Sequence, residues 1–305
     1  MTVTESCDLI YMTSYFNIGG VPEHFNIPLR KAIDEGVFSL KNMELIWKDY
    51  KGGTGDLVKA IREKQIEIGI LLTEGAIKAI ADGAPMKIVQ VYVNSPLYWG
   101  IYTGKNSSIF KLEDAVNPVF CISRYGSGSH LMAYLLCRRQ GWETKNIDFV
   151  EVGNFSGALK EFNHNPNRLF LWERFMTKPY LDSGTLRKID EIPTPWASFS
   201  IVVHDDLLRE NEDKVIELLK LVSDYTYKFK QNTLDSIDYI SNYFEFSVSD
   251  MKNWIQDTDW NYLLDVPYPK LEIALNFLKE VQLVDNTFNL HTLCPDDNFW
   301  TKCSL

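Results

Sequence analysis

The sequence predicts an α/β protein whose mainly parallel sheets are flanked by helices. Short apolar segments alternate with segments of helical periodicity over residues 1–203, which is typical of parallel strands joined by right-handed crossovers. The chain has 305 residues and 45% of them are hydrophobic, which is enough for two lobes that each contain a core.

The first unit of this pattern covers residues 1–94. Its predicted strands are four short apolar runs, residues 9–13, 43–47, 66–72 and 86–93. Between the first two strands, apolar residues recur at four-residue spacing from Phe25 to Val37, as on one face of a helix. A helix capped by Asp56 and another that ends near Gly83 complete the unit.

A second unit begins near Asn94. Its predicted strands are residues 119–123, 148–152, 168–172 and 198–203. A glycine-serine turn at residues 126–129 begins a helix that runs toward Gly141, and a shorter helix is expected over residues 157–162. From Asp205 onward the apolar spacing is helical throughout.

Composition and charge make several classes of function improbable. The net charge of −10 repels nucleic-acid phosphates and anionic lipids, so we expect no nucleic-acid partner. The sequence has no apolar run long enough to span a bilayer, so we expect no membrane insertion. The first residues lack a secretory signal and the five cysteines are scattered, so we expect a cytoplasmic protein without a disulfide framework.

No motif indicates a metal ion, a cofactor or a catalytic residue. The five histidines have no metal-ligand spacing with one another or with cysteine. The loop at residues 52–55 lacks the Lys-Ser/Thr of a phosphate-binding P-loop. The turn at residues 126–129 lacks the third glycine of a dinucleotide fingerprint, and Tyr125 replaces the first glycine of a nucleophile elbow.

Three stretches of sequence together resemble a known fold. They are residues 52–75, residues 123–130, and residues 171–175 followed by 193–199. In order and spacing they resemble the type II periplasmic-binding-protein fold. More narrowly, they resemble the branch that holds alkanesulfonate and taurine receptors and the proteins that bind or synthesise the thiamine pyrimidine precursor. A cytosolic, fungal-type member of this branch is one identity that fits.

The resemblance implies two lobes joined by two hinge strands, with a ligand cleft between them. Lobe I would hold residues 1–94 and 198–305, and lobe II would hold residues 95–197. The expected hinges are residues 93–95 and 196–198. The physical rule that open α/β sheets bind ligands at the carboxyl ends of their strands points to the same cleft.

The candidate ligand-binding residues follow predicted strands, occupy glycine-rich loops or lie near the hinges. They are Ser14, Tyr15, Phe16, Gly53, Thr54, Thr73, Glu74, Asn94, Tyr98, Tyr125, Ser127, Gly128, Ser129, His130, Trp172, Glu173 and Trp196. Several have alternative interpretations. Glu74 is also suited to the charge of a helix N-terminus, and Glu173 could form an ion pair with Arg174 or Lys178.

These residues favour a protein that binds a small heteroaromatic ligand, such as a thiamine pyrimidine precursor. The aromatic content of 13% and the carboxylate of Glu173 beside Trp172 suit a planar ligand that is not an anion. The N-terminus of the helix that the turn at residues 126–129 opens favours an anion instead, so a sulfonate remains an alternative ligand.

An enzyme on the same scaffold is the second alternative, of the pyrimidine-biosynthesis or desulfinase type, with His130 as acid/base assisted by Ser127 or Ser129. The sequence lacks the His and Cys cluster and the cleft-loop Cys that the resemblance associates with these enzymes. No feature identifies a protein partner.

Overall fold

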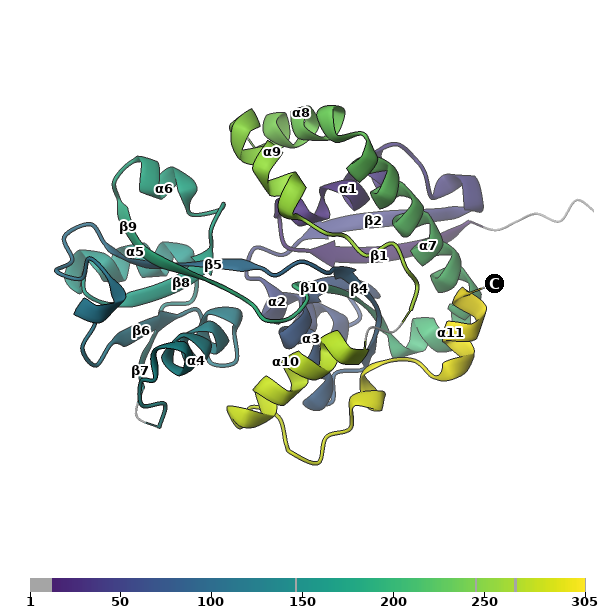
Figure 1. Ribbon diagram of the computed structural model, residues 1–305. Helices are drawn as coiled ribbons and strands as arrows, with labels where there is room; N and C mark the ends of the chain where they lie inside the picture. Colours follow the sequence, from purple (N-terminus) through teal and green to yellow (C-terminus); the bar gives the residue numbers. More distant parts are fainter. Residues whose placement is uncertain (1–12, 146, 245, 266–267, 305) are drawn as a thin grey trace, which may run out of the picture.

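Two five-stranded sheets form the framework of the protein, one in each lobe (Figure 1). The structure is a computed structural model that describes residues 13–145, 147–244, 246–265 and 268–304. The strand order is β2-β1-β3-β10-β4 in lobe I and β7-β6-β8-β5-β9 in lobe II. The predicted fold class, two α/β lobes with mainly parallel sheets, is therefore confirmed.

Lobe I contains strands from both ends of the described chain. They are β1 (Ser14–Gly20), β2 (Met43–Asp49), β3 (Ile68–Leu72), β4 (Met86–Val93) and β10 (Phe199–His204). Strand β1 pairs in parallel with β2 and β3, and β10 lies antiparallel between β3 and β4. Four strands therefore run in one direction, and the strand that opposes them is the one that returns from lobe II.

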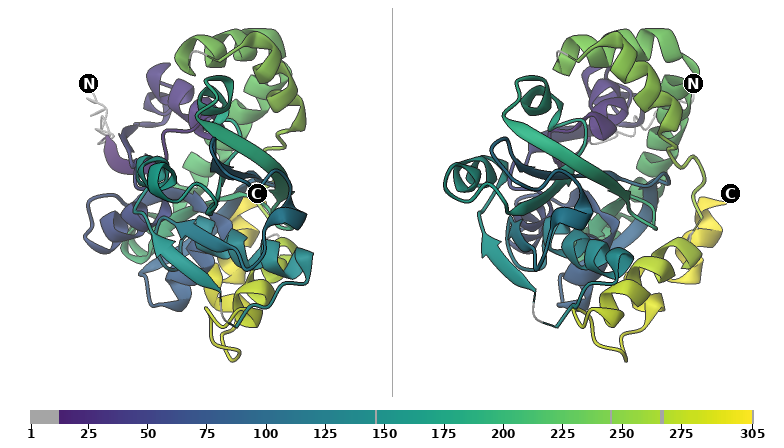
Figure 2. Two further views of the ribbon diagram at one scale, coloured as in Figure 1. Left: turned by 90° about the vertical axis from the view of Figure 1, so that its left-hand side faces the viewer. Right: turned by 60° about the vertical axis from the view of Figure 1, so that its left-hand side comes forward.

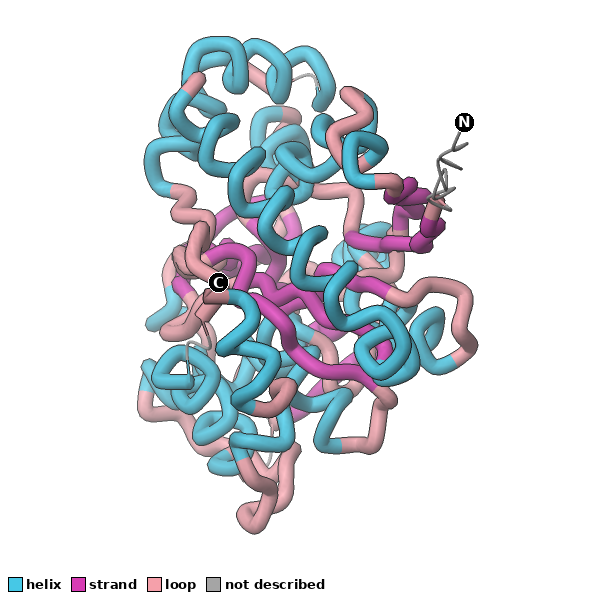
Figure 3. The backbone as a smooth tube through the Cα atoms, turned by 90° about the vertical axis from the view of Figure 1, so that its right-hand side faces the viewer, coloured by secondary structure: helices cyan, strands magenta, loops and turns pink. Residues whose placement is uncertain are grey.

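Helices cover both faces of this sheet, as Figure 3 shows in a view from the lobe I side. One face carries α1 (Ile27–Asp34), α7 (Asp205–Gln231), α8 (Thr233–Phe244) and α9 (Val248–Asp257). The other carries α2 (Thr54–Arg62), α3 (Thr73–Ala81) and α10 (Tyr268–Glu280). The last helix, α11 (Asp297–Cys303), packs against α7. Because both faces are covered, β3 is almost continuously apolar and buried.

Lobe II repeats this plan on a smaller scale. Its strands are β5 (Tyr98–Gly104), β6 (Val119–Ile122), β7 (Asp148–Glu151), β8 (Leu169–Glu173) and β9 (Leu186–Pro193). Its helices are α4 (Gly128–Gln140), α5 (Phe155–His164) and α6 (Lys178–Asp182). Strand β6 is parallel to β7 and β8, whereas β5 is antiparallel to both β8 and β9. Figure 2 views this lobe from its outer side.

Two chain segments cross between the lobes and lie side by side. One links β4 to β5 and the other links β9 to β10. The Ser198 amide donates to the Val93 carbonyl at 3.0 Å, and the Thr194 amide donates to the Leu97 carbonyl at 3.0 Å. The predicted lobe boundaries at 94/95 and 197/198 fall within these segments. Paired crossovers of this kind are suited to a hinge.

Several helix and strand positions differ from those predicted by the sequence analysis. Residues 9–12 of the first predicted strand lie outside the described residues, and β1 begins at Ser14. Asp56 does not cap α2, because the capping position is Gly53 and Asp56 lies in the first turn. Strands β5 and β9 were missed, since β5 contains glycines and half of the residues of β9 are charged. No described helix is long and apolar enough to cross a membrane.

Candidate functional site

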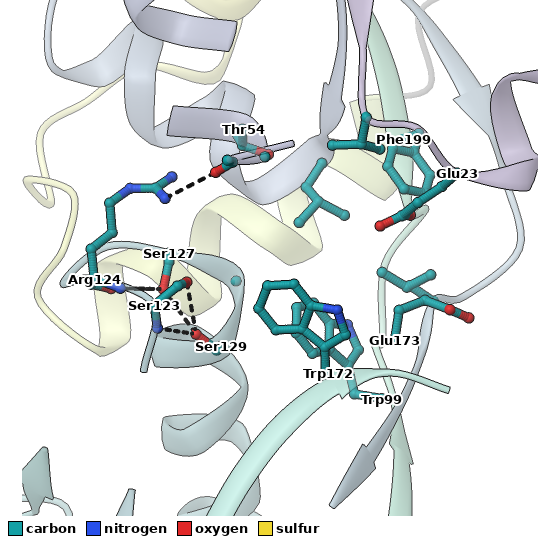
Figure 4. Close-up of a pocket in the computed structure, with 16 residues that line it drawn as sticks. Glu23, Thr54, Trp99, Ser123, Arg124, Ser127, Ser129, Trp172, Glu173 and Phe199 are labelled. Carbon is teal, nitrogen blue, oxygen red and sulfur yellow. Dashed lines mark hydrogen bonds between the residues drawn. The ribbon is translucent and has the colours of Figure 1, made fainter. Parts of the chain in front are cut away.

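A cavity of about 70 Å³ lies between the lobes and is lined by residues of both (Figure 4). Lobe I contributes Val21, Glu23, Gly52, Gly53, Thr54, Leu72 and Phe199. Lobe II contributes Leu97, Trp99, Ser123, Arg124, Ser127, Gly128, Ser129, Trp172 and Glu173. Many of these residues lie at or just beyond the carboxyl ends of β1, β2, β3, β6 and β8, where open α/β sheets bind ligands.

Aromatic side chains form the apolar walls of the cavity. The rings of Trp99 on β5 and Trp172 on β8 meet edge to face, with centroids 6.4 Å apart. Trp172 in turn stacks on Phe170 at 5.2 Å, which fixes its orientation. Phe199, the first residue of β10, closes the lobe I side. Walls of this kind suit a flat ligand, because ring faces and edges pack closely against a second ring.

Two glycines allow the backbone to approach the cavity. Gly53, at the N-cap position of α2, has φ of 76°, a left-handed conformation that disfavours other residues. A Cβ at Gly128 would lie 2.7 Å from the Trp99 ring and 3.1 Å from Leu72 Cδ1. The absence of a side chain at Gly128 therefore lets the first turn of α4 pack directly against both lobes.

The serines at the start of α4 form a hydrogen-bonded cluster. Ser127 caps the helix by accepting from the His130 amide, and its hydroxyl donates to the Arg124 carbonyl at 2.6 Å. Ser129 Oγ accepts from the Ser123 amide at 2.9 Å and lies 3.1 Å from Ser127 Oγ. The cluster holds the helix N-terminus, with its partial positive charge, toward the cavity.

Arg124 connects the two lobes on this side of the cavity. Its Nη1 donates to the Gly52 carbonyl at 3.4 Å, from the β6–α4 loop to the β2–α2 loop. Burial lowers the pKa of Arg124, although Asp56 and Glu151 oppose this effect. A guanidinium stays protonated in proteins, so Arg124 places a cation on this side of the cavity.

Two carboxyl groups lie on the other side of the cavity (Figure 4). Glu173, at the end of β8, is buried, and its Oε2 accepts from the amides of Phe175 at 2.9 Å and Met176 at 2.8 Å. Burial raises the pKa of Glu173 to about 7, against the effect of these bonds. Burial and the charge of Glu173 together raise the pKa of Glu23 to about 8. The pair therefore retains a proton near neutral pH.

The structure brings seven of the predicted site residues to the cavity: Gly53, Thr54, Ser127, Gly128, Ser129, Trp172 and Glu173. Their contact with a ligand stays a prediction. The remaining candidates lie elsewhere and have other partners.

The candidates Ser14, Tyr15 and Phe16 are at the wrong end of β1. Because the strand begins at Ser14, these residues start it instead of following it. Tyr15 is 67% exposed, and Phe16 is buried in the core beside a separate hollow. The residues that do follow β1 include Val21 and Glu23, and both line the cavity.

Four candidates near the hinges bind other protein groups instead of lining the cavity. Thr73 Oγ1 lies 2.9 Å from Ser200 Oγ. Glu74 accepts from Trp196 Nε1 at 2.8 Å, and both side chains are buried. Asn94 Oδ1 accepts from Lys270 Nζ at 2.5 Å. The sequence allowed two interpretations of Glu74, a ligand contact and the charge of a helix N-terminus. Neither predicted its hydrogen bond with Trp196.

The last three candidates lie outside the cavity in lobe II. Arg174 lies over the Tyr98 ring at 4.3 Å. Tyr125 is 63% exposed. His130 is buried, its Nδ1 accepts from the Gly126 amide at 3.0 Å, and burial lowers its pKa to about 4. An acid/base role for His130 therefore has no support in this geometry.

Nine cavity residues were missed by the sequence analysis: Val21, Glu23, Gly52, Leu72, Leu97, Trp99, Ser123, Arg124 and Phe199. A correct position for β1 would have identified Glu23 by the same strand-end rule that identified Glu173. Over the described residues, no group of three or more His, Cys, Asp or Glu side chains could hold a metal ion.

Comparisons with known proteins agree with this architecture. A family model described as Ca3427-like PBP matches residues 99–192. The Candida albicans CA3427 gene product, which exhibits the generic periplasmic-binding-protein fold, is 24% identical with a TM-score of 0.82, over 95% of this chain and 94% of that one. No curated protein matches the sequence.

Sulfonate-binding proteins are also structurally similar. The Escherichia coli aliphatic sulphonate binding protein SsuA is 14% identical with a TM-score of 0.68, over 93% of this chain and 92% of that one. The alkanesulfonate-binding protein SsuA from Xanthomonas axonopodis pv. citri, bound to MOPS, is 11% identical with a TM-score of 0.76, over 93% of this chain and 99% of that one. The chain thus has the periplasmic-binding-protein fold that its sequence predicted.

Proposed function

We propose that this protein binds a small planar ligand and closes its two lobes over it, and that the ligand is a heteroaromatic compound of the thiamine pyrimidine precursor type. The observation that supports this most directly is the cavity between the lobes. It combines the Trp99 and Trp172 walls with the carboxyl groups of Glu23 and Glu173. Binding between two lobes is the usual use of such an interlobe cleft.

An aminopyrimidine matches the chemistry of the carboxyl side. Its ring packs against tryptophan, and its edge presents an amino donor beside a ring-nitrogen acceptor. A carboxylate accepts from the amino group, and a protonated carboxyl group donates to the ring nitrogen. Glu23 and Glu173, whose pKa values are both raised, supply this mixed pair near neutral pH.

A sulfonate-type anion is the second candidate ligand. Arg124 and the N-terminus of α4 are suited to an anion, and two structurally similar proteins bind sulfonates by name. The two carboxyl groups in the same small cavity argue against a simple anion. A ligand that carries both an amino group and an anionic group would satisfy both sides.

Thermal stabilisation by added compounds tests the proposal. We expect 4-amino-5-hydroxymethyl-2-methylpyrimidine to raise the melting temperature, because a ligand that binds only the folded state at a hundred times its Kd stabilises by about 2.7 kcal/mol. Trp172→Ala should abolish this shift, whereas Tyr125→Ala, at an exposed site outside the cavity, should preserve it. Stabilisation by taurine alone would contradict the proposed ligand class, and turnover of the pyrimidine would favour the enzyme alternative.

A cytoplasmic location is also proposed, because the five scattered cysteines do not indicate a disulfide framework, and subcellular fractionation of the native protein tests it.

A further inference from the structure

Glu23 and Glu173 reach the same cavity from different lobes. Glu23 lies in the loop after β1 of lobe I, and Glu173 ends β8 of lobe II. Figure 4 shows both on the side of the cavity opposite to Arg124 and the serines. Their separation therefore depends on how far the lobes are closed.

Few protein groups offset the negative charge of the Glu23 and Glu173 carboxylates. No described residue forms a hydrogen bond or ion pair with the Glu23 carboxyl group, and the bonds to Glu173 occupy Oε2. Arg174, the cation whose charge acts on Glu173, is already paired with Glu191 at 3.1 Å and Asp257 at 3.5 Å. His24, next to Glu23, is buried with both ring nitrogens unpartnered, and burial lowers its pKa to about 3, so it adds no charge.

Other titratable groups do not neutralise the pair either. Those that face it or its immediate neighbours are Tyr102, Arg124, Arg174, Lys188, Glu191 and Asp257. Tyr102 is neutral because burial raises its pKa, and Lys188 pairs with Glu191. Arg124 lies across the cavity from the pair. Two carboxylates that line one cavity repel each other unless a proton or a cation offsets their charge.

The lobes contact each other through apolar side chains that share one buried core cluster, through the buried Trp196–Glu74 hydrogen bond at 2.8 Å, and through partly exposed ion pairs. The ion pairs that join them are Arg138–Glu280 at 2.6 Å, Arg174–Asp257 at 3.5 Å and Lys178–Asp250 at 3.7 Å. Each such surface pair contributes little. Glu173 is buried and Glu23 is half-buried, so repulsion between their carboxylates is screened less than these surface ion pairs and opposes closure.

We propose that Glu23 and Glu173 gate closure of the cleft. When both are ionised, their repulsion keeps the empty lobes apart, and a cationic ligand group such as an ammonium or amidinium offsets their charge and lets the lobes close. The gate rests on the receptor function proposed above, and it adds the chemical group that the site selects, an ammonium- or amidinium-like edge. Closure also protonates the empty pair, so it is favoured at acidic pH.

Small-angle X-ray scattering of the ligand-free protein tests the gate without any ligand. We expect the radius of gyration of the wild type to increase as the pH rises from 5.5 to 9 at constant ionic strength. Glu23→Gln and Glu173→Gln should each remain compact across this range, because one carboxylate has no like charge to repel. Glu74→Gln is the matched control, since Glu74 is buried and its pKa is also raised, to about 7, but it lies outside the cavity.

Equal behaviour of the wild type and both glutamine variants would overturn the gate, as would loss of the pH response in the Glu74 control alone. If one variant fails to fold, the other still decides, because either substitution removes the repulsion. Circular dichroism identifies a variant that is unfolded.

Benzamidine and its neutral analogue benzamide serve as probes of the selected group. We expect benzamidine affinity in the wild type to increase between pH 6 and pH 8, by up to tenfold per pH unit if one proton is released. Benzamide should lack this dependence, and Glu23→Gln should reduce it. A pH-independent benzamidine affinity would contradict the proposed selection.

The outcomes separate the gate from the receptor function. If the pyrimidine compacts the wild type but pH has no effect on the empty protein, the gate is wrong and the receptor function stands. If neither pH nor any probe changes the radius of gyration, both proposals are wrong.

Discussion

Glu74 gives a quantitative test of how a buried carboxyl group limits stability. Its side chain is 1% exposed and accepts from Trp196 at 2.8 Å, while its Oε1 has no partner. Burial raises its pKa from 4.5 to about 7, with the backbone and Trp196 hydrogen bonds acting in the opposite direction. At about 1.4 kcal/mol per pH unit, this difference corresponds to roughly 3 kcal/mol.

The direction of the pH dependence follows from the linkage between protonation of Glu74 and folding. The pKa of Glu74 is higher in the folded state than in the unfolded state, so its protonated form stabilises the fold. This stabilisation is complete below about pH 4.5 and is lost as the pH rises to about 7. Glu74→Gln keeps an acceptor for Trp196 but cannot ionise. We therefore expect the variant to match the wild type at pH 4.5 and to be more stable by up to about 3 kcal/mol at pH 8.

Urea denaturation followed by tryptophan fluorescence at the two pH values measures this difference. Glu63→Gln, which replaces an exposed carboxylate in the same lobe, is the control and should show no comparable gain at pH 8. The reasoning would be refuted if Glu74→Gln were equally destabilised at both pH values.

Three further substitutions test the cavity and its supports. Ser127→Ala removes the cap of α4 and should cost about 1 kcal/mol of unfolding free energy, measured by urea denaturation. Gly128→Ala places a Cβ 2.7 Å from Trp99 and should weaken binding of the aminopyrimidine at least tenfold in calorimetry, and unchanged affinity would argue against this cavity as the site. Arg124→Gln removes the cation beside Gly52 and should weaken taurine far more than benzamidine, and equal losses for the two compounds would contradict the assigned polarity.

Local sequence signals predicted much of the fold because they act over short distances. The apolar run at residues 86–93 matches β4, whose side chains are almost all buried between two helical layers. The Ser127 cap and the left-handed Gly141 define the ends of α4, where side-chain and backbone geometry decide the boundary. Gly83 likewise has φ of 74° just after α3.

Features set by tertiary pairing were less predictable. Strand β9 contains Arg187, Lys188, Asp190 and Glu191, so its sequence lacks an apolar strand signal, and its pairing with β5 holds it in place. Trp99 was not predicted to line the cavity, because the strand that carries it, β5, was not predicted. The first strand was predicted a few residues too early in the sequence. Tyr15, near the start of β1, was therefore predicted to contact the ligand in place of Glu23, which follows the end of β1.

The two sides of the cavity together constrain the ligand more than either does alone. A simple sulfonate would suit Arg124 and the N-terminus of α4 but would leave the negative charge that Glu23 and Glu173 share near neutral pH unpaired and facing the anion. A neutral apolar ring would pack on Trp99 and Trp172 but would offer no hydrogen bond to the Glu23 carboxyl group or to Glu173 Oε1. A ligand with donor groups at one end and acceptor or anionic groups at the other satisfies both sides in one orientation. That polarity, more than ring size, should therefore decide which compounds close the lobes.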